Sequence, residues 1–230
     1  MRTTSLLAAI AILVPAMACA QIDQGAAGGW YSYGWTDRFE DSRLGWQGDI
    51  QHRNWDVAGD LEQLLVRTGV TWTPQGSNVR YTLGAAHIRF GAFGPSSADS
   101  EETRLYQEAF IPQTLNQRFL LSHRWRLEQR WVEGQDLRNR IRYFLGLNVP
   151  LNQDTLAQGA WYLSFSNELF LNLEQDIGNS RSVDYFDRNR FYAALGYSIS
   201  DRTRLQAGYM WQETDKLGKG QIQLNIFQNF

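Results

Sequence analysis

Residues 118–149 read RFLLSHRWRLEQRWVEGQDLRNRIRYFLGLNV, and this stretch decides the fold. Two alternating segments flank residues 133–136, EGQD, which are typical of a tight turn. Within each segment, apolar side chains occupy one period-2 face and mostly charged side chains occupy the other. The apolar face holds Phe119, Leu121, Trp125, Leu127, Trp131, Ile141, Tyr143, Leu145, Leu147 and Val149; the charged face holds Arg124, Arg126, Glu128, Arg130, Arg138, Arg140 and Arg142. The stretch therefore predicts a β-hairpin with one apolar and one charged face.

Similar alternation continues along the whole chain, which predicts one all-β domain. Turn-like residues separate the segments, and longer polar connections are expected at 91–103 and 172–184. Most segments are longer than the roughly 5–6 residues of soluble strands and match the roughly 9–11 residues that cross a bilayer. With the two hairpin strands there are eleven candidates, the others being 30–39, 43–53, 61–73, 79–90, 104–111, 160–171, 186–199, 205–211 and 222–230.

The burial of the charged face separates a membrane barrel from a soluble one. An arginine facing lipid near the bilayer midplane costs roughly 2–4 kcal/mol, so in a membrane the charged face must line the lumen. In a soluble barrel, the many aromatic side chains would compete for one small interior. The pattern favours an antiparallel up-and-down transmembrane β-barrel, with girdles of aromatic side chains such as Trp72, Trp131, Trp161, Tyr197 and Trp211. A soluble, periplasmic, lipocalin-like binding barrel is the alternative.

The expected strand number is about twelve, within a range of 10–12. If the last strand ends with Phe230 at the periplasmic rim, a barrel of eleven strands would place Trp30, at the start of the first strand, at the outer rim. The N-terminus of the chain, however, starts in the periplasm. A weak extra strand within residues 21–29 would resolve this conflict and give twelve.

The first twenty residues have the layout of a secretory signal peptide, with Arg2, an apolar run over 6–14 and small residues up to Ala20. Cleavage is predicted between Ala20 and Gln21, leaving a barrel domain of 21–230. A second interpretation is a lipoprotein signal that leaves Cys19 acylated. The expected location is the outer membrane of a Gram-negative bacterium, in contact with outer-membrane lipid and lipopolysaccharide. The net charge of −2 gives no indication of a nucleic-acid partner, and the oligomeric state stays open.

Several short stretches resemble the family called domain of unknown function 2490 (DUF2490), whose members are presumed outer-membrane barrels. They are residues 123–130 with Arg138, Arg140 and Arg142, residues 166–170 (SNELF), residues 186–190 (FDRNR), and the Gly-Tyr pairs at 196–197 and 208–209. The resemblance implies a barrel and no assigned activity. The alternation that ends at Phe230 also resembles the terminal signal read by the barrel-assembly machinery, although Gln228 departs from it.

The predicted lumen residues are Arg124, Arg126, Glu128, Arg130, Arg138, Arg140, Arg142, Glu168, Arg188 and Arg190. One interpretation is a ladder of Arg–Glu pairs that ties neighbouring strands together. The other is a positively biased constriction that binds or passes small anions, because rings of arginine favour anions. The two can coexist in a lumen that is narrow or plugged.

An outer-membrane lipid hydrolase is the enzymatic alternative. It would need a serine within hydrogen-bond reach of a histidine base. Ser122 and His123 are adjacent, so on a strand they point to opposite faces and form no dyad. His52 and His87 have no evident Ser and Asp/Asn partners. We therefore expect no enzyme activity and no cofactor.

Metal binding has little support in the sequence. The three histidines show no ligand spacing. Glu174, Asp176 and Asn179 offer oxygen ligands for calcium or for cations bound to lipopolysaccharide, but they are expected to be solvated loop residues. The acidic residues of the other long connection are interpreted in the same way: Asp99, Glu101 and Glu102.

Overall fold

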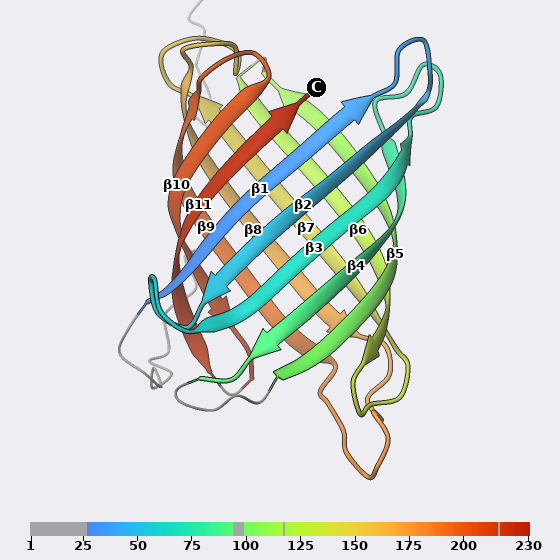
Figure 1. The fold of residues 1–230 in the computed structure, drawn as a ribbon. Helices are drawn as coiled ribbons and strands as arrows, with labels where there is room; N and C mark the ends of the chain where they lie inside the picture. The colour runs from blue at the N-terminus through green and yellow to red at the C-terminus, as the bar shows by residue number, and fades with distance from the viewer. Residues whose placement is uncertain (1–26, 94–98, 117, 216) are drawn as a thin grey trace, which may run out of the picture.

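The protein is a closed β-barrel of eleven described strands (Figure 1). The computed structural model describes residues 27–93, 99–116, 118–215 and 217–230. The strands are β1 (Gly28–Arg38), β2 (Leu44–Asn54), β3 (Leu61–Trp72), β4 (Arg80–Gly91), β5 (Asp99–Leu115), β6 (Phe119–Val132), β7 (Arg138–Pro150), β8 (Trp161–Asn172), β9 (Phe186–Ser198), β10 (Thr203–Glu213) and β11 (Gly218–Asn229). No helix in the described part of the chain is long and apolar enough to cross a membrane.

The barrel closes between its first and last strands, which run parallel. Gly28 lies opposite Gln221 and Thr36 opposite Asn229, and every other neighbouring pair is antiparallel. The prediction of an antiparallel barrel is therefore wrong at this seam, because a closed ring with an odd number of strands cannot alternate throughout. Eleven lies within the expected range, and Gly28 and Gly29 belong to β1 itself. Residues 21–26 of the proposed twelfth strand lie outside the described residues, as do the predicted signal peptide (1–20), Cys19 and the Ala20/Gln21 cleavage site.

The connections define two ends of the barrel. The Phe230 end carries residues 39–43, 73–79, 116, 118, 151–160 and 199–202. The Gly28 end carries 55–60, 92–93, 133–137, 173–185, 214–215 and 217, and the loop between β8 and β9 projects furthest there (Figure 1). Both connections expected to be long therefore lie at the same end.

The predicted hairpin is confirmed as β6 and β7, with Glu128 opposite Arg140 and Arg126 opposite Arg142. The expected boundaries of β5 are wrong. This strand begins at Asp99 and has 17 residues. Its polar start resembles a loop in sequence, but Asp99 forms an ion pair with Arg89 on β4, and Glu102 points into the barrel.

The barrel buries its charged side chains and exposes its apolar ones. Leu83, Trp125 and Leu195 are exposed on the outer surface, whereas Arg126, Glu128 and Arg140 are buried. The alternation in sequence thus fixes which residues point inward, as the hairpin pattern predicts. A soluble protein of this size normally has the opposite distribution.

Two inward tyrosines lie flat across glycines of the neighbouring strand. Tyr106 faces Gly84, and Tyr162 faces Gly196. A Cβ atom at Gly84 would lie 2.4 Å from the Tyr106 ring, and one at Gly196 would lie 2.2 Å from the Tyr162 ring. Glycine is needed at both positions because the ring occupies the space of a side chain.

We expect Gly196→Ala to lower the free energy of unfolding by about 1–3 kcal/mol, because the added methyl group would displace the buried Tyr162 ring. Gly34→Ala is the matched control, since a Cβ there meets its nearest atom at 3.7 Å. Urea unfolding of the refolded barrel in detergent measures both. Equal midpoints for the two variants would contradict the packing argument.

Candidate functional site: the charged lumen

The lumen contains a cavity of about 470 Å³. Its lining begins near the Phe230 end, at Thr36 and Asn229, and continues inward to Arg53, Arg104 and Arg190. No described residue of the loops at either end lines it. The cavity therefore lies within the strands of the barrel, and arginines and acidic side chains line much of it.

All ten predicted lumen residues lie inside the barrel. Arg124, Arg126, Arg130, Arg140, Arg142, Glu168, Arg188 and Arg190 line the cavity. Glu128 and Arg138 are buried in the barrel interior next to it. Phe230, the predicted assembly signal, is exposed, and its backbone N–H donates to the Thr36 carbonyl across the seam at 3.0 Å.

Glu128 is the centre of the ion-pair network. Arg140 donates to its Oε2 through Nε (3.0 Å) and Nη2 (2.6 Å), and Arg142 donates to its Oε1 through Nη1 (2.6 Å). Arg126 and Arg104 also lie near Oε1, with Nη1 atoms at 3.8 and 4.0 Å. One buried carboxylate thus interacts with four guanidinium groups.

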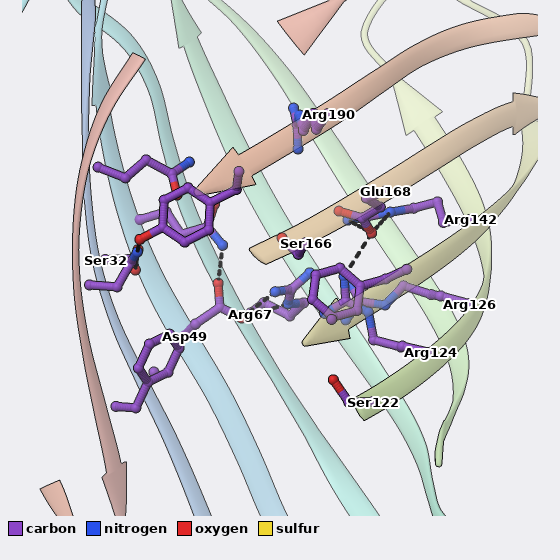
Figure 2. A pocket seen from close by; sticks show the side chains of 18 of the residues that line it. Ser32, Asp49, Arg67, Ser122, Arg124, Arg126, Arg142, Ser166, Glu168 and Arg190 are labelled. Carbon is purple, nitrogen blue, oxygen red and sulfur yellow. Dashed lines mark hydrogen bonds and ion pairs between the residues drawn. The ribbon is translucent and has the colours of Figure 1, made fainter. Parts of the chain in front are cut away.

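Arg142 extends this network to β8. Its Nε and Nη2 donate to Glu168 Oε1 at 2.9 and 2.6 Å, and Arg124 Nη2 donates to the same oxygen at 2.7 Å. Figure 2 shows Arg124 and Arg142 converging on Glu168. The network therefore ties β6, β7 and β8 together, as the predicted Arg–Glu ladder requires.

Two acidic residues extend the network to β5, and sequence reasoning missed both as lumen residues. Glu102, expected to be solvated, is buried and accepts from Arg130 Nε at 2.5 Å and Arg104 Nε at 2.6 Å. Glu108 accepts from Arg126 Nε at 2.7 Å. Both lie on the same period-2 face of the strand as Arg104, and this shared face could have identified them as inward-facing residues. Glu101, the intervening residue, is exposed as expected.

Phe170 is an aromatic centre within the arginines. This residue is 1% exposed, and the guanidinium carbons of Arg142, Arg190, Arg140 and Arg188 lie 4.3–5.9 Å from its ring centroid. Cations are attracted to the electron-rich face of such a ring. Sequence reasoning missed Phe170 because it assigned apolar side chains to the outer face, although Phe170 shares the parity of Glu168.

The loop between β8 and β9 packs on the turn between β6 and β7. Glu174 accepts from the Asn139 backbone N–H (2.6 Å) and side-chain amide (2.8 Å), and these bonds lower the pKa of its carboxyl. Asp136 N–H donates to the Ile177 carbonyl at 3.0 Å. Among the described residues, no group of three or more His, Cys, Asp or Glu side chains could hold a metal ion.

Ser122 and His123 lie on opposite faces of β6, as predicted. Ser122 lines the cavity. His123 Nδ1 lies 2.8 Å from Tyr143 Oη, and its Nε2 lies 3.2 Å from Gln113 Oε1. The two side chains therefore do not form the dyad that a lipid hydrolase would need.

The family model described as "Protein of unknown function (DUF2490)" matches residues 27–223. The match covers most of the chain and confirms the resemblance carried by the hairpin and by β8 and β9. No curated protein and no solved structure matches the chain.

Proposed function

We propose that this chain, which belongs to the DUF2490 family of proteins of unknown function, is a non-enzymatic outer-membrane β-barrel with a narrow, anion-favouring lumen. One observation carries the proposal: the closed barrel is apolar outside and charged inside. Lipid solvates the outer face without a partner, and the ion pairs satisfy the inner face.

The outer surface has further features that suit a bilayer. Trp72 and Trp161 are exposed at the Phe230 end of their strands, and Trp131 is exposed at the Gly28 end of β6. These positions match aromatic girdles at two interfaces. Two pairs of side-chain amides on the outer surface are also hydrogen-bonded to each other. Gln107 and Gln129 each donate to the other, and so do Asn167 and Asn189. Such pairing reduces the cost of polar groups in hydrocarbon.

The preference for anions follows from the charges around the cavity. Twelve arginines and three carboxylates line it, so the bias of the lining is positive. The carboxylates are Asp49, Glu108 and Glu168, and the arginines are Arg53, Arg67, Arg80, Arg104, Arg124, Arg126, Arg130, Arg140, Arg142, Arg188, Arg190 and Arg204. An excess of arginine around a pore favours anions over cations.

Fractionation tests the location. The full chain, expressed in a Gram-negative host, is expected in the outer-membrane fraction, resistant to carbonate extraction and soluble only with detergent. Recovery of the folded protein from the periplasm without detergent would contradict the proposal and favour a lipocalin-like binder.

Conductance tests the lumen. We expect the refolded protein in a planar bilayer under a salt gradient to give small, steady openings with an anion-favouring reversal potential. Openings that favour cations, or a silent bilayer containing folded protein, would contradict an anion-favouring pore.

A further inference from the structure

We propose that Arg53 and Arg190, which both lie against the ring of Trp30, form a binding site for one compact oxyanion of the phosphate or sulfate class in the part of the lumen nearer the Gly28 end. The inference rests on the proposed function, since it places a ligand in the anion-favouring lumen. It goes further in naming the residues and the chemical class of the ligand.

Trp30 brings the two arginines together. It lies on β1 directly opposite Arg53 on β2, and its side chain points inward, leaving the residue 8% exposed. The guanidinium carbon of Arg53 lies 3.5 Å from the indole centroid. Arg190 reaches the same indole from β9, at 5.1 Å, and also lies 4.8 Å from the ring of Phe170. Both arginines line the cavity, so a solute in the lumen can reach them.

Neither arginine forms an ion pair with a carboxylate among the described residues. Within residues 27–93, 99–116, 118–215 and 217–230, no acidic oxygen lies within 4.0 Å of either guanidinium group. Glu168 is opposite Arg190 in the sheet register, but it is bound by Arg142 and Arg124. Glu62, on β3 near Arg53, is bound by Lys219 at 2.7 Å.

Both groups have donors that make no hydrogen bond to a described residue. Arg53 Nη2 donates to Gln51 at 2.5 Å, while its buried Nε has no partner among the described residues. Arg190 Nε donates to Gln212 at 2.8 Å, and its terminal nitrogens make no hydrogen bond to any described residue. Figure 2 shows Arg190 entering the lumen apart from the group around Glu168.

Charge and shape together indicate an oxyanion. Two buried cations held against one ring carry a desolvation cost that glutamine partners offset only in part. The stacked aromatic ring offsets some of it. A tetrahedral oxyanion presents several acceptors at once and matches the planar donor fork of arginine. Chloride offers one charge and no such geometry, so the site should discriminate against it.

Isothermal titration of the refolded full-length barrel in detergent, with inorganic phosphate at constant ionic strength in chloride, tests the site. We expect one phosphate per barrel and at least a tenfold loss of affinity in the Arg53→Gln/Arg190→Gln double variant. Arg89→Gln is the control, because Arg89 is exposed and pairs with Asp99 outside the lumen. No binding by the wild type, or equal affinity in the double variant, would overturn the proposal.

Heat-modified gel mobility first verifies that each variant is folded. If the double variant does not fold, Arg190→Gln alone is used and is still expected to weaken phosphate binding at least fivefold. Glycerol 3-phosphate distinguishes the source of the ligand: tighter binding than inorganic phosphate supports a lipid head group, and weaker binding supports a free anion. Because this titration uses purified barrel, a failure to bind phosphate would contradict the binding site and would leave the location tested by fractionation unaffected.

Discussion

Glu128→Ala is expected to lower the free energy of unfolding by about 3–5 kcal/mol, the cost of removing one partner from a buried ion pair. The Glu128 side chain is 2% exposed and accepts from Arg140 and Arg142. Without it, these two guanidinium groups and those of Arg104 and Arg126 would face one another in the barrel interior without the carboxylate they share. The loss should therefore exceed that of an ordinary side-chain truncation.

Urea unfolding of the refolded barrel in detergent provides the measurement, and Glu101→Ala provides the matched control. The Glu101 side chain is 62% exposed and faces outward, so its loss should change stability by no more than about 0.5 kcal/mol. Glu128→Gln keeps the volume and one acceptor, and its midpoint should fall between those of the wild type and the alanine variant. Equal midpoints for Glu128→Ala and Glu101→Ala would contradict a stabilising network.

Leu105→Arg is expected to lower the free energy of unfolding in lipid vesicles by about 2–4 kcal/mol, the cost of an arginine that faces lipid near the midplane. Leu105 is 45% exposed on the outer surface. It lies opposite Ala85, the sixth of the twelve residues of β4, so it is far from both rims.

Leu151→Arg is the control for this variant. Leu151 is 46% exposed, but it follows β7 in the connection 151–160. An arginine at the rim should cost at most about 1 kcal/mol in a bilayer. On a water-facing surface both substitutions should have effects within about 0.5 kcal/mol. A near-zero effect of Leu105→Arg would therefore contradict the proposal that this face meets lipid.

The period-2 pattern predicted most of the fold because it fixes the direction of each side chain. It placed eleven strand segments and the inward direction of all ten candidate residues. It also predicted Arg–Glu pairs between neighbouring strands, and the structure pairs Glu128 with Arg140 across the hairpin. At the start of β5, however, inward-facing charges have the same composition as a solvated loop, and Glu102 was misassigned for this reason.

Which arginine pairs with which carboxylate cannot be read from one sequence, because the pairs do not simply follow the residues that lie opposite each other on neighbouring strands. Arg142 reaches Glu168 diagonally, because Arg142 itself lies opposite Phe170 on β8. Arg104 pairs with Glu102 two residues away on the same strand. The interior aromatics Phe170 and Trp30 were missed because hydrophobicity assigns them to the outer face, whereas their cation–π contacts place them inside.

The parallel seam implies that the barrel has one strand more than a fully antiparallel ring needs. Without β1, the neighbours at the gap would be β2 and β11, and without β11 they would be β1 and β10. In both cases the remaining ten strands would alternate in direction all the way round. An even ring would thus have sufficed for closure, and parallel pairing is slightly less stable per residue. The additional strand β1 carries Trp30, on whose ring Arg53 and Arg190 meet.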